Sequence, residues 1–222
     1  METIRDGIIL IDKPAEMTSF GVVARIRRVL SNEQGKKVKV GHTGTLDPFA
    51  TGLMIIVVGK ECKNAGMYSK LDKVYEATIR LGQTSTTGDP EGDIVPVSEN
   101  VPTEDEILEV LGQFKGEITQ KPPIYSAIKI DGERAYKRAR NGEVIEMPLR
   151  QITVFSLERI DYSYPELKIR VHVSSGAYIR TLAEDIGAAL GTGAYCSELR
   201  RISISKWDIK DAQTLADFGI VD

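Results

Sequence analysis

The chain has 222 residues, which is enough for one domain with little else attached. Hydrophobic residues make up 41% and charged residues 27%, which excludes wholesale disorder, and the longest apolar run, residues 53–58, is far short of the roughly 20 residues of a membrane span. The net charge of -3 taken alone argues against a polyanionic partner, but residues 83–110 hold eight acidic residues and no Lys or Arg, so the remainder of the chain is net positive. We expect this acidic segment to face away from any surface that binds a polyanion.

In chain order, the N-terminal part predicts two buried strands separated by a helix and a glycine-rich loop. The apolar run within residues 7–12 is short enough for a buried strand, and Thr18 or Ser19 is placed to cap the helix that follows. That helix is defined by apolar residues at helical spacing, which are Val22, Val23, Ile26, Val29 and Leu30. A loop over residues 41–52 then leads into a strand at residues 53–58.

The rest of the chain predicts strands that do not alternate regularly with helices. Residues 74–81 and the cleanly alternating residues 167–173 are typical of strands, whereas residues 103–111 begin with the spacing of a capping box and predict a helix. A further helix over residues 179–190 is closed by Gly191. We therefore predict an α+β fold with a large, mainly antiparallel sheet.

Cysteine and histidine usage bears on the compartment and on metals. Cys62 and Cys196 show no pairing pattern, which is typical of a reducing, cytosolic setting. Two cysteines and two histidines, far apart, do not supply the ligand spacing of a structural zinc site. The N-terminus also lacks the basic-then-apolar order of a signal peptide, so we expect a cytoplasmic protein that spans no membrane.

The strongest chemical motif is the loop over residues 41–52, in which Asp47 is followed by Pro48. Proline fixes its own φ and favours an extended conformation of the preceding residue, so this loop is suited to present one carboxylate rigidly. It lacks the Gly-Lys-Ser/Thr of a phosphate-binding P-loop. The residues alone leave two interpretations open, a catalytic carboxylate or a surface turn that uses Asp and Pro for its geometry.

Two further residues stand out. Arg180 falls in the first turn of the predicted helix, where a cation opposes the helix dipole, so its guanidinium is expected to bind a carboxylate or a phosphate. The alternative is a surface pair with Glu184, four residues along the helix. Tyr75 is either an active-site aromatic residue or a core aromatic residue of the strand over residues 74–81.

At these residues the sequence resembles the TruB family of bacterial tRNA pseudouridine synthases. Residues 41–53 resemble the family's catalytic motif, and residues 7–19 resemble its opening motif. Four further segments match in order, namely Lys73-Val74-Tyr75, Lys121-Pro122-Pro123 with Tyr125-Ser126-Ala127, Gly176-Ala177-Tyr178-Ile179-Arg180, and Leu199-Arg200-Arg201. The resemblance covers residues 7 to about 204, and its ordered motifs exclude a chance match.

The resemblance implies a fold and a reaction. The fold is the pseudouridine-synthase fold, a large mixed, mainly antiparallel sheet flanked by helices with a central active-site cleft. The reaction is isomerisation of uridine 55 in the tRNA T loop to pseudouridine, without metal or cofactor, after the base is flipped out. Asp47 is then the nucleophile at C1′ of the ribose, and Arg180 favours its charged form or holds a phosphate. Tyr75 stacks on the uracil near C5, and whether it removes the C5 proton stays open.

Substrate contacts are implied as well. His42 matches the histidine that takes the place of the flipped base in the RNA stack, Tyr178 and Leu199 match residues that line the uracil pocket, and Lys13 is expected to support the Asp47 loop. RNA is held mainly through phosphates and shape, so basic residues are candidates for backbone contacts, with a solvated charged surface as the alternative. The candidates are Arg25, Arg28, Lys36, Lys37, Lys39, Lys129, Arg134, Lys137, Arg138 and Arg140. The last five lie within residues 118–150, which match the family's thumb insertion.

We expect one catalytic domain over residues 1–222, without the C-terminal PUA-type RNA-binding domain that bacterial members usually carry. The implied partner is the T arm of tRNA, bound by a monomer with no obligatory protein partner. One alternative function is a tRNA-folding factor that binds RNA on the same scaffold, and the intact Asp47, Tyr75 and Arg180 argue against it. The other is a nucleotide-dependent enzyme, and the missing P-loop lysine argues against that.

Overall fold

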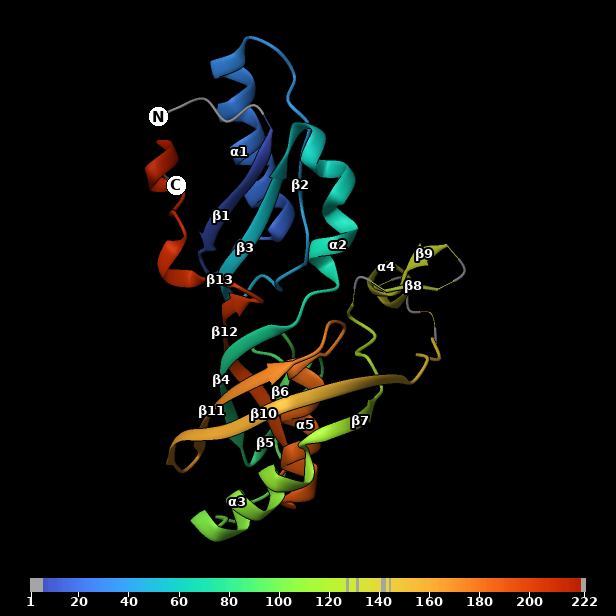
Figure 1. The fold of residues 1–222 in the computed structure, drawn as a ribbon. Helices are drawn as coiled ribbons and strands as arrows, with labels where there is room; N and C mark the ends of the chain where they lie inside the picture. Colours follow the sequence, from blue (N-terminus) through green and yellow to red (C-terminus); the bar gives the residue numbers. More distant parts are fainter. Residues whose placement is uncertain (1–5, 127, 131, 141–142, 144, 221–222) are drawn as a thin grey trace. The chain divides into compact units, whose positions relative to one another are not determined.

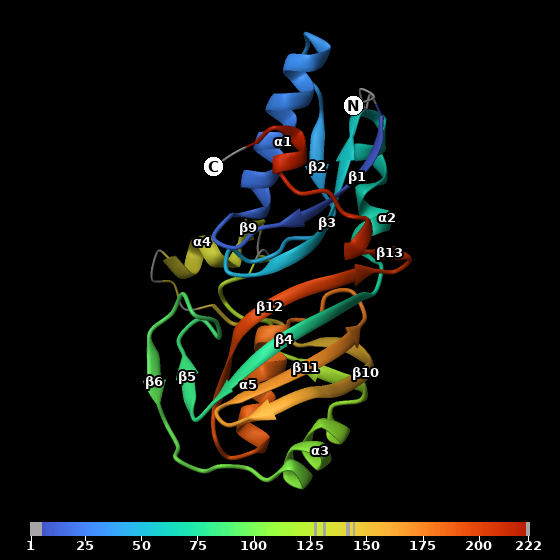
Figure 2. The same cartoon turned by 90° about the vertical axis from the view of Figure 1, so that its left-hand side faces the viewer.

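The structure is a computed structural model that describes residues 6–126, 128–130, 132–140, 143 and 145–220 (Figures 1 and 2). The chain divides into two compact units, unit 1 with residues 1–75 and 200–222, and unit 2 with residues 76–199. Strands β4 (Lys73–Leu81) and β12 (Ala194–Ile204) contribute residues to both.

Unit 1 is built on strands β1 and β3, which lie between helices α1 and α2 in Figure 2. Besides its residues of β4 and β12, this unit contains β1 (Gly7–Lys13), α1 (Ser19–Gln34), β2 (Val40–His42), β3 (Thr51–Val58), η1 (Gly59–Asn64), α2 (Ala65–Ser69), β13 (Trp207–Asp208), η2 (Ile209–Asp211) and η3 (Ala216–Phe218). β1 and β2 pair with β3 antiparallel, whereas β12 pairs with it in parallel through Arg200 and Arg201. Since residues 52–58 of β3 are all buried, protein covers both faces of this strand.

Helix α1 shows why its sequence folds as predicted. The Thr18 side chain accepts a hydrogen bond from the Gly21 backbone N–H, which caps the first turn. The helix ends at Gly35, whose φ of 61° is a left-handed conformation that glycine adopts without strain. Four of the five predicted apolar positions are buried, so the predicted inward face of this helix is confirmed.

Unit 2 is a sheet with the strand order β12-β4-β11-β10-β7. Besides its residues of β4 and β12, this unit contains β5 (Gln83–Ser85), β6 (Ile94–Pro96), α3 (Glu104–Gln113), β7 (Gly116–Gln120), β8 (Lys129–Ile130), β9 (Glu133–Arg134), α4 (Ala135–Arg140), β10 (Arg150–Ser163), β11 (Glu166–Val173) and α5 (Ile179–Ala189). Strand β10 pairs antiparallel with both β11 and β7. Helix α5 runs behind the sheet in Figure 2, and α3 contacts both β10 and α5. Helices α3 and α5 thus cover one face of its sheet.

The predicted α+β class, with a large mixed and mainly antiparallel sheet flanked by helices, is confirmed. The capping box at Thr103 is present, with the Glu106 side chain accepting from the Thr103 backbone N–H. The predicted alternation of β11 is present too, because Leu167, Ile169 and Val171 are fully buried. Among the described residues, no helix is both long and apolar enough to cross a membrane.

Candidate active site

The backbone on both sides of Asp47 is anchored within unit 1. Leu46, the preceding residue, donates its N–H to Ser19 Oγ at 2.8 Å and accepts from the same hydroxyl at 2.9 Å. The carbonyl of Pro48, the following residue, accepts from Lys13 Nζ at 3.1 Å. These bonds tie the loop to the start of α1 and the end of β1, so Asp47 stands on a rigid segment rather than on a mobile turn.

Lys13 is fully buried, and its ammonium group donates hydrogen bonds to backbone carbonyl oxygens. Besides Pro48, it donates to the carbonyl oxygens of Pro14 and Met17, both at 2.7 Å. An ammonium group has three N–H donors, and each of the three carbonyl oxygens accepts a hydrogen bond from it. Lys13 therefore joins the opening motif to the Asp47 loop, which is the contact that the predicted supporting role requires.

Arg201 holds the same loop from β12. Its side chain is buried, with Nε donating to the Leu53 carbonyl at 2.6 Å and Nη2 donating to the Gly44 carbonyl at 3.2 Å. Gly44 and Leu53 flank the loop on either side of Asp47, so one guanidinium ties both ends together. Gly52 makes this possible, since its φ is 108° and a Cβ there would lie 2.4 Å from the Arg201 carbonyl oxygen.

Replacing Gly52 with alanine should therefore displace β3 from β12. The new methyl group would overlap backbone atoms of Arg201, which cannot swing aside, and φ would be strained as well. We expect the free energy of unfolding to fall by about 2–4 kcal/mol, measured by urea denaturation. Gly66→Ala is the matched control, because a Cβ at Gly66 meets nothing within 4 Å, and an equal loss there would contradict the argument.

Lys73 is a buried cation in the same unit as Asp47 and Tyr75. Its Nζ donates to the carbonyl oxygens of Ser69, at 3.0 Å, and Leu71. The pKa of Lys73 is lowered from 10.5 to about 8, mainly by burial and also by the charge of Arg201, while Asp72 opposes the shift. Tyr75, two residues along β4, is 8% exposed, so both interpretations of its ring agree with its burial.

This pKa predicts a pH dependence of stability. Between pH 8 and 10.5 the unfolded chain holds a proton on Lys73 that the folded chain has released, so stability should rise with pH across this window. The full shift corresponds to at most about 3 kcal/mol, at about 1.4 kcal/mol per pKa unit. Urea denaturation at several pH values should show this rise in the wild type and a flatter profile in Lys73→Met. Identical profiles would contradict the prediction.

In unit 2, Arg180 is 3% exposed, and its guanidinium donates hydrogen bonds to one carboxylate and two backbone carbonyl groups. Its Nη1 donates to Asp89 Oδ2 at 3.0 Å and to the Thr87 carbonyl at 2.8 Å, and its Nη2 donates to the Tyr125 carbonyl at 2.9 Å. The expectation that a carboxylate compensates this cation at a helix start is confirmed for Asp89. The predicted approach of Arg180 to Asp47 joins residues of different units and stays a prediction.

Asp89 is the acid of the predicted acidic segment that lies against Arg180. This carboxylate is 3% exposed, and its Oδ1 accepts from Thr87 Oγ1 at 2.5 Å and from the Glu91 N–H at 3.0 Å. One acid of residues 83–110 is therefore buried against a predicted catalytic residue, and the orientation of this segment relative to RNA stays a prediction. Glu91 and Asp93, in the same turn, are exposed.

Glu184, the alternative partner of Arg180, is half-buried and lies near other acidic groups. A Cβ at Gly88 would lie 2.9 Å from Glu184 Oε1, so this carboxylate packs against the turn that carries Asp89. Burial raises the pKa of Glu184, the neighbouring Asp185 raises it further, and Arg180 opposes the shift. An exposed surface pair is therefore wrong, since Arg180 itself is buried.

The remaining predicted substrate-site residues occupy defined positions. Tyr178 is the residue before α5, and Gln120 holds it twice, donating from Nε2 to the Tyr178 carbonyl and accepting its N–H through Oε1. Tyr178 also packs on Ile128, Ala135 and Met147 of the thumb segment. Leu199 is buried in β12, and His42 is half-buried at the end of β2.

The basic candidates for backbone contacts fall into two groups. In unit 1, Arg28, Lys36, Lys37 and Lys39 are exposed and Arg25 is half-buried. In the thumb segment, Arg138 forms an ion pair with Glu143 at 2.7 Å. The side chains of Lys129, Arg134, Lys137 and Arg140 lie outside the described part of the structure.

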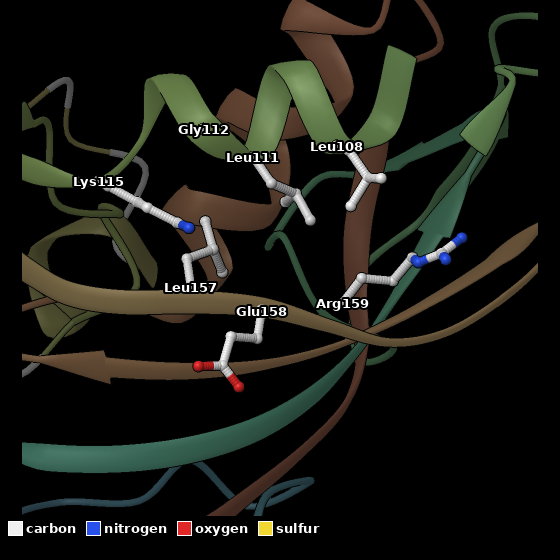
Figure 3. Close-up of a pocket in the computed structure, with 7 residues that line it drawn as sticks. All are labelled: Leu108, Leu111, Gly112, Lys115, Leu157, Glu158 and Arg159. Carbon is white, nitrogen blue, oxygen red and sulfur yellow. The ribbon is translucent and has the colours of Figure 1, made fainter. Parts of the chain in front are cut away.

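A hollow of about 310 Å³ lies elsewhere in unit 2, between α3 and β10 (Figure 3). It is lined by Leu108, Leu111, Gly112, Lys115, Leu157, Glu158 and Arg159. Figure 3 shows Lys115 and Arg159 at opposite ends of it, and Arg159 is paired with Glu104 at 2.7 Å. None of the predicted site residues lines this hollow.

Known proteins similar to this chain agree in family. The family model "TruB family pseudouridylate synthase (N terminal domain)" matches residues 27–179, and the model "tRNA pseudouridylate synthase B C-terminal domain" matches residues 180–220. A tRNA pseudouridine synthase B of Azoarcus sp. (strain BH72) is 46% identical over 96% of this chain and 69% of its own length. The corresponding protein of Corynebacterium efficiens is 44% identical over 95% of this chain and 71% of its own length.

Solved structures agree as well. A structure of a Cbf5–Nop10–Gar1 complex matches with a TM-score of 0.75 and 33% identity, over 97% of this chain and 54% of that chain. An H/ACA RNP bound to a substrate RNA containing 2′-deoxyuridine matches with a TM-score of 0.70 and 31% identity, over 95% of this chain and 51% of that chain. The chain thus spans about half the length of these two structural relatives.

Proposed function

The chain belongs to the TruB family of pseudouridylate synthases and is a tRNA pseudouridine synthase, and we propose that its target is uridine 55 in the T loop. The observation that carries the catalytic part of this proposal is the rigid presentation of Asp47, whose neighbours Leu46 and Pro48 are bound to Ser19 and Lys13. A catalytic nucleophile gains from such a fixed position, whereas a surface turn that serves only as a connection has no need of it.

The proposed chemistry needs one carboxylate and no cofactor. The target uridine is flipped out, the Asp47 carboxylate attacks C1′, and the N1–C1′ bond breaks with its electron pair leaving on the uracil. The uracil turns, C5 bonds to C1′ as the carboxylate leaves, and C5 then loses its proton while N1 gains one. Arg180, already held by Asp89, is proposed to stabilise the carboxylate or a phosphate of the target nucleotide, and Tyr75 to stack on the uracil.

The proposal extends to the partner. The T arm is held by residues 118–150 as a thumb and by the basic residues named above, with His42 in the RNA stack and Tyr178 and Leu199 lining the uracil pocket. We propose that residues 1–222 act as one catalytic domain, as a cytoplasmic monomer without an obligatory protein partner. Light scattering of the protein alone and of its complex with one hairpin should give one chain in each case.

Mapping the product tests the target. The protein is incubated with full tRNA transcript and with an isolated T-arm hairpin, and pseudouridine is located by carbodiimide labelling and primer extension. We expect pseudouridine at position 55 in both RNAs and none in a hairpin with cytidine at that position. Modification at another position instead of 55, or in neither RNA, would overturn the proposal.

A further inference from the structure

The first turn of α1 exposes an aromatic ring beside the Asp47 loop. The side chain of Phe20 is 64% exposed, although α1 buries its neighbours Ser19, Val22 and Val23. The inward face of the helix is therefore complete without Phe20. A phenylalanine left in water forgoes the favourable free energy of burying its ring, so a partner that covers the ring would gain that free energy.

The guanidinium of Arg27 lies over the Phe20 ring. Its guanidinium carbon lies 5.8 Å from the centroid of the Phe20 ring, two helical turns along the same face. The guanidinium is held there, because Nη2 donates to the Val40 carbonyl at 3.2 Å. A planar cation fixed beside an exposed ring forms a mixed surface on which a flat, electron-rich group can stack.

The place of this surface in unit 1 points to the RNA. Ser19, the residue before Phe20, exchanges two hydrogen bonds with Leu46, the residue before Asp47. An RNA strand whose target nucleotide reaches Asp47 therefore brings its neighbouring nucleotides to this end of α1. The charge agrees, since the first turn of α1 holds no acidic residue and Arg28 is exposed on the same helix.

We propose that Phe20 and Arg27 form a stacking site for an unpaired nucleobase next to the target uridine. The inference rests on the proposed function, and it adds a base contact outside the uracil pocket. Aromatic rings and arginine planes are the groups on which proteins stack unpaired RNA bases, and every base has a face that can stack. Phe20 thereby positions the RNA for catalysis and takes no part in the chemical step.

The test uses T-arm hairpins that carry 2-aminopurine at each unpaired loop position except the target, one position at a time. Stacking on an aromatic ring quenches 2-aminopurine fluorescence. We expect wild type to quench one position strongly, Phe20→Tyr to keep that quenching, and Phe20→Ala to lose it with about tenfold weaker hairpin binding. Phe155→Ala is the matched control, because Phe155 is a similarly exposed phenylalanine of unit 2, at 55%.

The outcomes separate the inference from the proposed function. Equal affinity and equal quenching in wild type and Phe20→Ala would overturn the stacking site, as would an equal loss of affinity in Phe155→Ala. If wild type forms pseudouridine in these hairpins while showing no quenched position, the stacking site is wrong and the proposed function stands. If wild type forms no pseudouridine in them, the proposed function has failed instead.

Discussion

Asp47→Asn should bind a T-arm hairpin within about twofold of wild type and form pseudouridine at least about 10³-fold more slowly. Asparagine has nearly the shape of aspartate, and the bonds that fix this loop belong to the backbone of Leu46 and Pro48, so the loop should keep its position. The amide, however, is too weak a nucleophile to attack C1′. Removing the charge therefore removes the chemical step and leaves binding in place.

Single-turnover release of tritium from hairpins labelled at C5 of the target uridine measures the rate, and filter binding measures the affinity. Asp211→Asn, an exposed aspartate of unit 1, is the matched control and should keep the wild-type rate. Unreduced turnover in Asp47→Asn would end the catalytic assignment of this residue. The variant also isolates the alternative function, since a tRNA-folding factor would still rescue misfolded tRNA without the Asp47 carboxylate.

The sequence predicted well those parts of the fold that local chemistry determines. Thr18, Gly35 and the apolar stripe define α1 through capping and periodicity alone. Strand β10 was not anticipated, although it is the longest strand of unit 2. Two register irregularities interrupt its alternation, and Phe155 and Ile160 are exposed on it, so its pattern does not show the period of two by which strands are found.

In the candidate site, too, the sequence predicted the features that local chemistry determines and missed most of those that depend on the tertiary structure. The Asp47 loop was found because glycine and Asp-Pro have strong local meaning, but of the groups that hold the loop only Lys13 was given its role. Arg201 and Ser19 contact the loop across 157 and 27 positions of the chain, and only the tertiary structure brings them together. The dipole argument required a carboxylate or a phosphate for Arg180, yet Asp89 was assigned only to the acidic segment over residues 83–110.

Asp89 is the residue on which the buried charge of Arg180 depends, so its replacement should be costly. Breaking a buried ion pair by removing one partner typically costs 3–5 kcal/mol, because the other charge stays buried without compensation. Here the carbonyls of Thr87 and Tyr125 continue to accept from the guanidinium, which favours the low end of that range. We therefore expect Asp89→Asn to lower the free energy of unfolding by about 3 kcal/mol, measured by urea denaturation.

The matched control is Asp93→Asn, four residues along the same acidic turn, whose carboxylate is exposed and whose loss should cost less than about 0.5 kcal/mol. A double-mutant cycle with Arg180→Met then tests the cause. If Arg180 is what makes Asp89 necessary, Asp89→Asn should be far less costly in the Arg180→Met background, with a coupling energy of about 1–3 kcal/mol. Additive losses would mean that Asp89 stabilises its turn through Thr87 and Glu91 instead, and that the acidic segment has no part in holding Arg180.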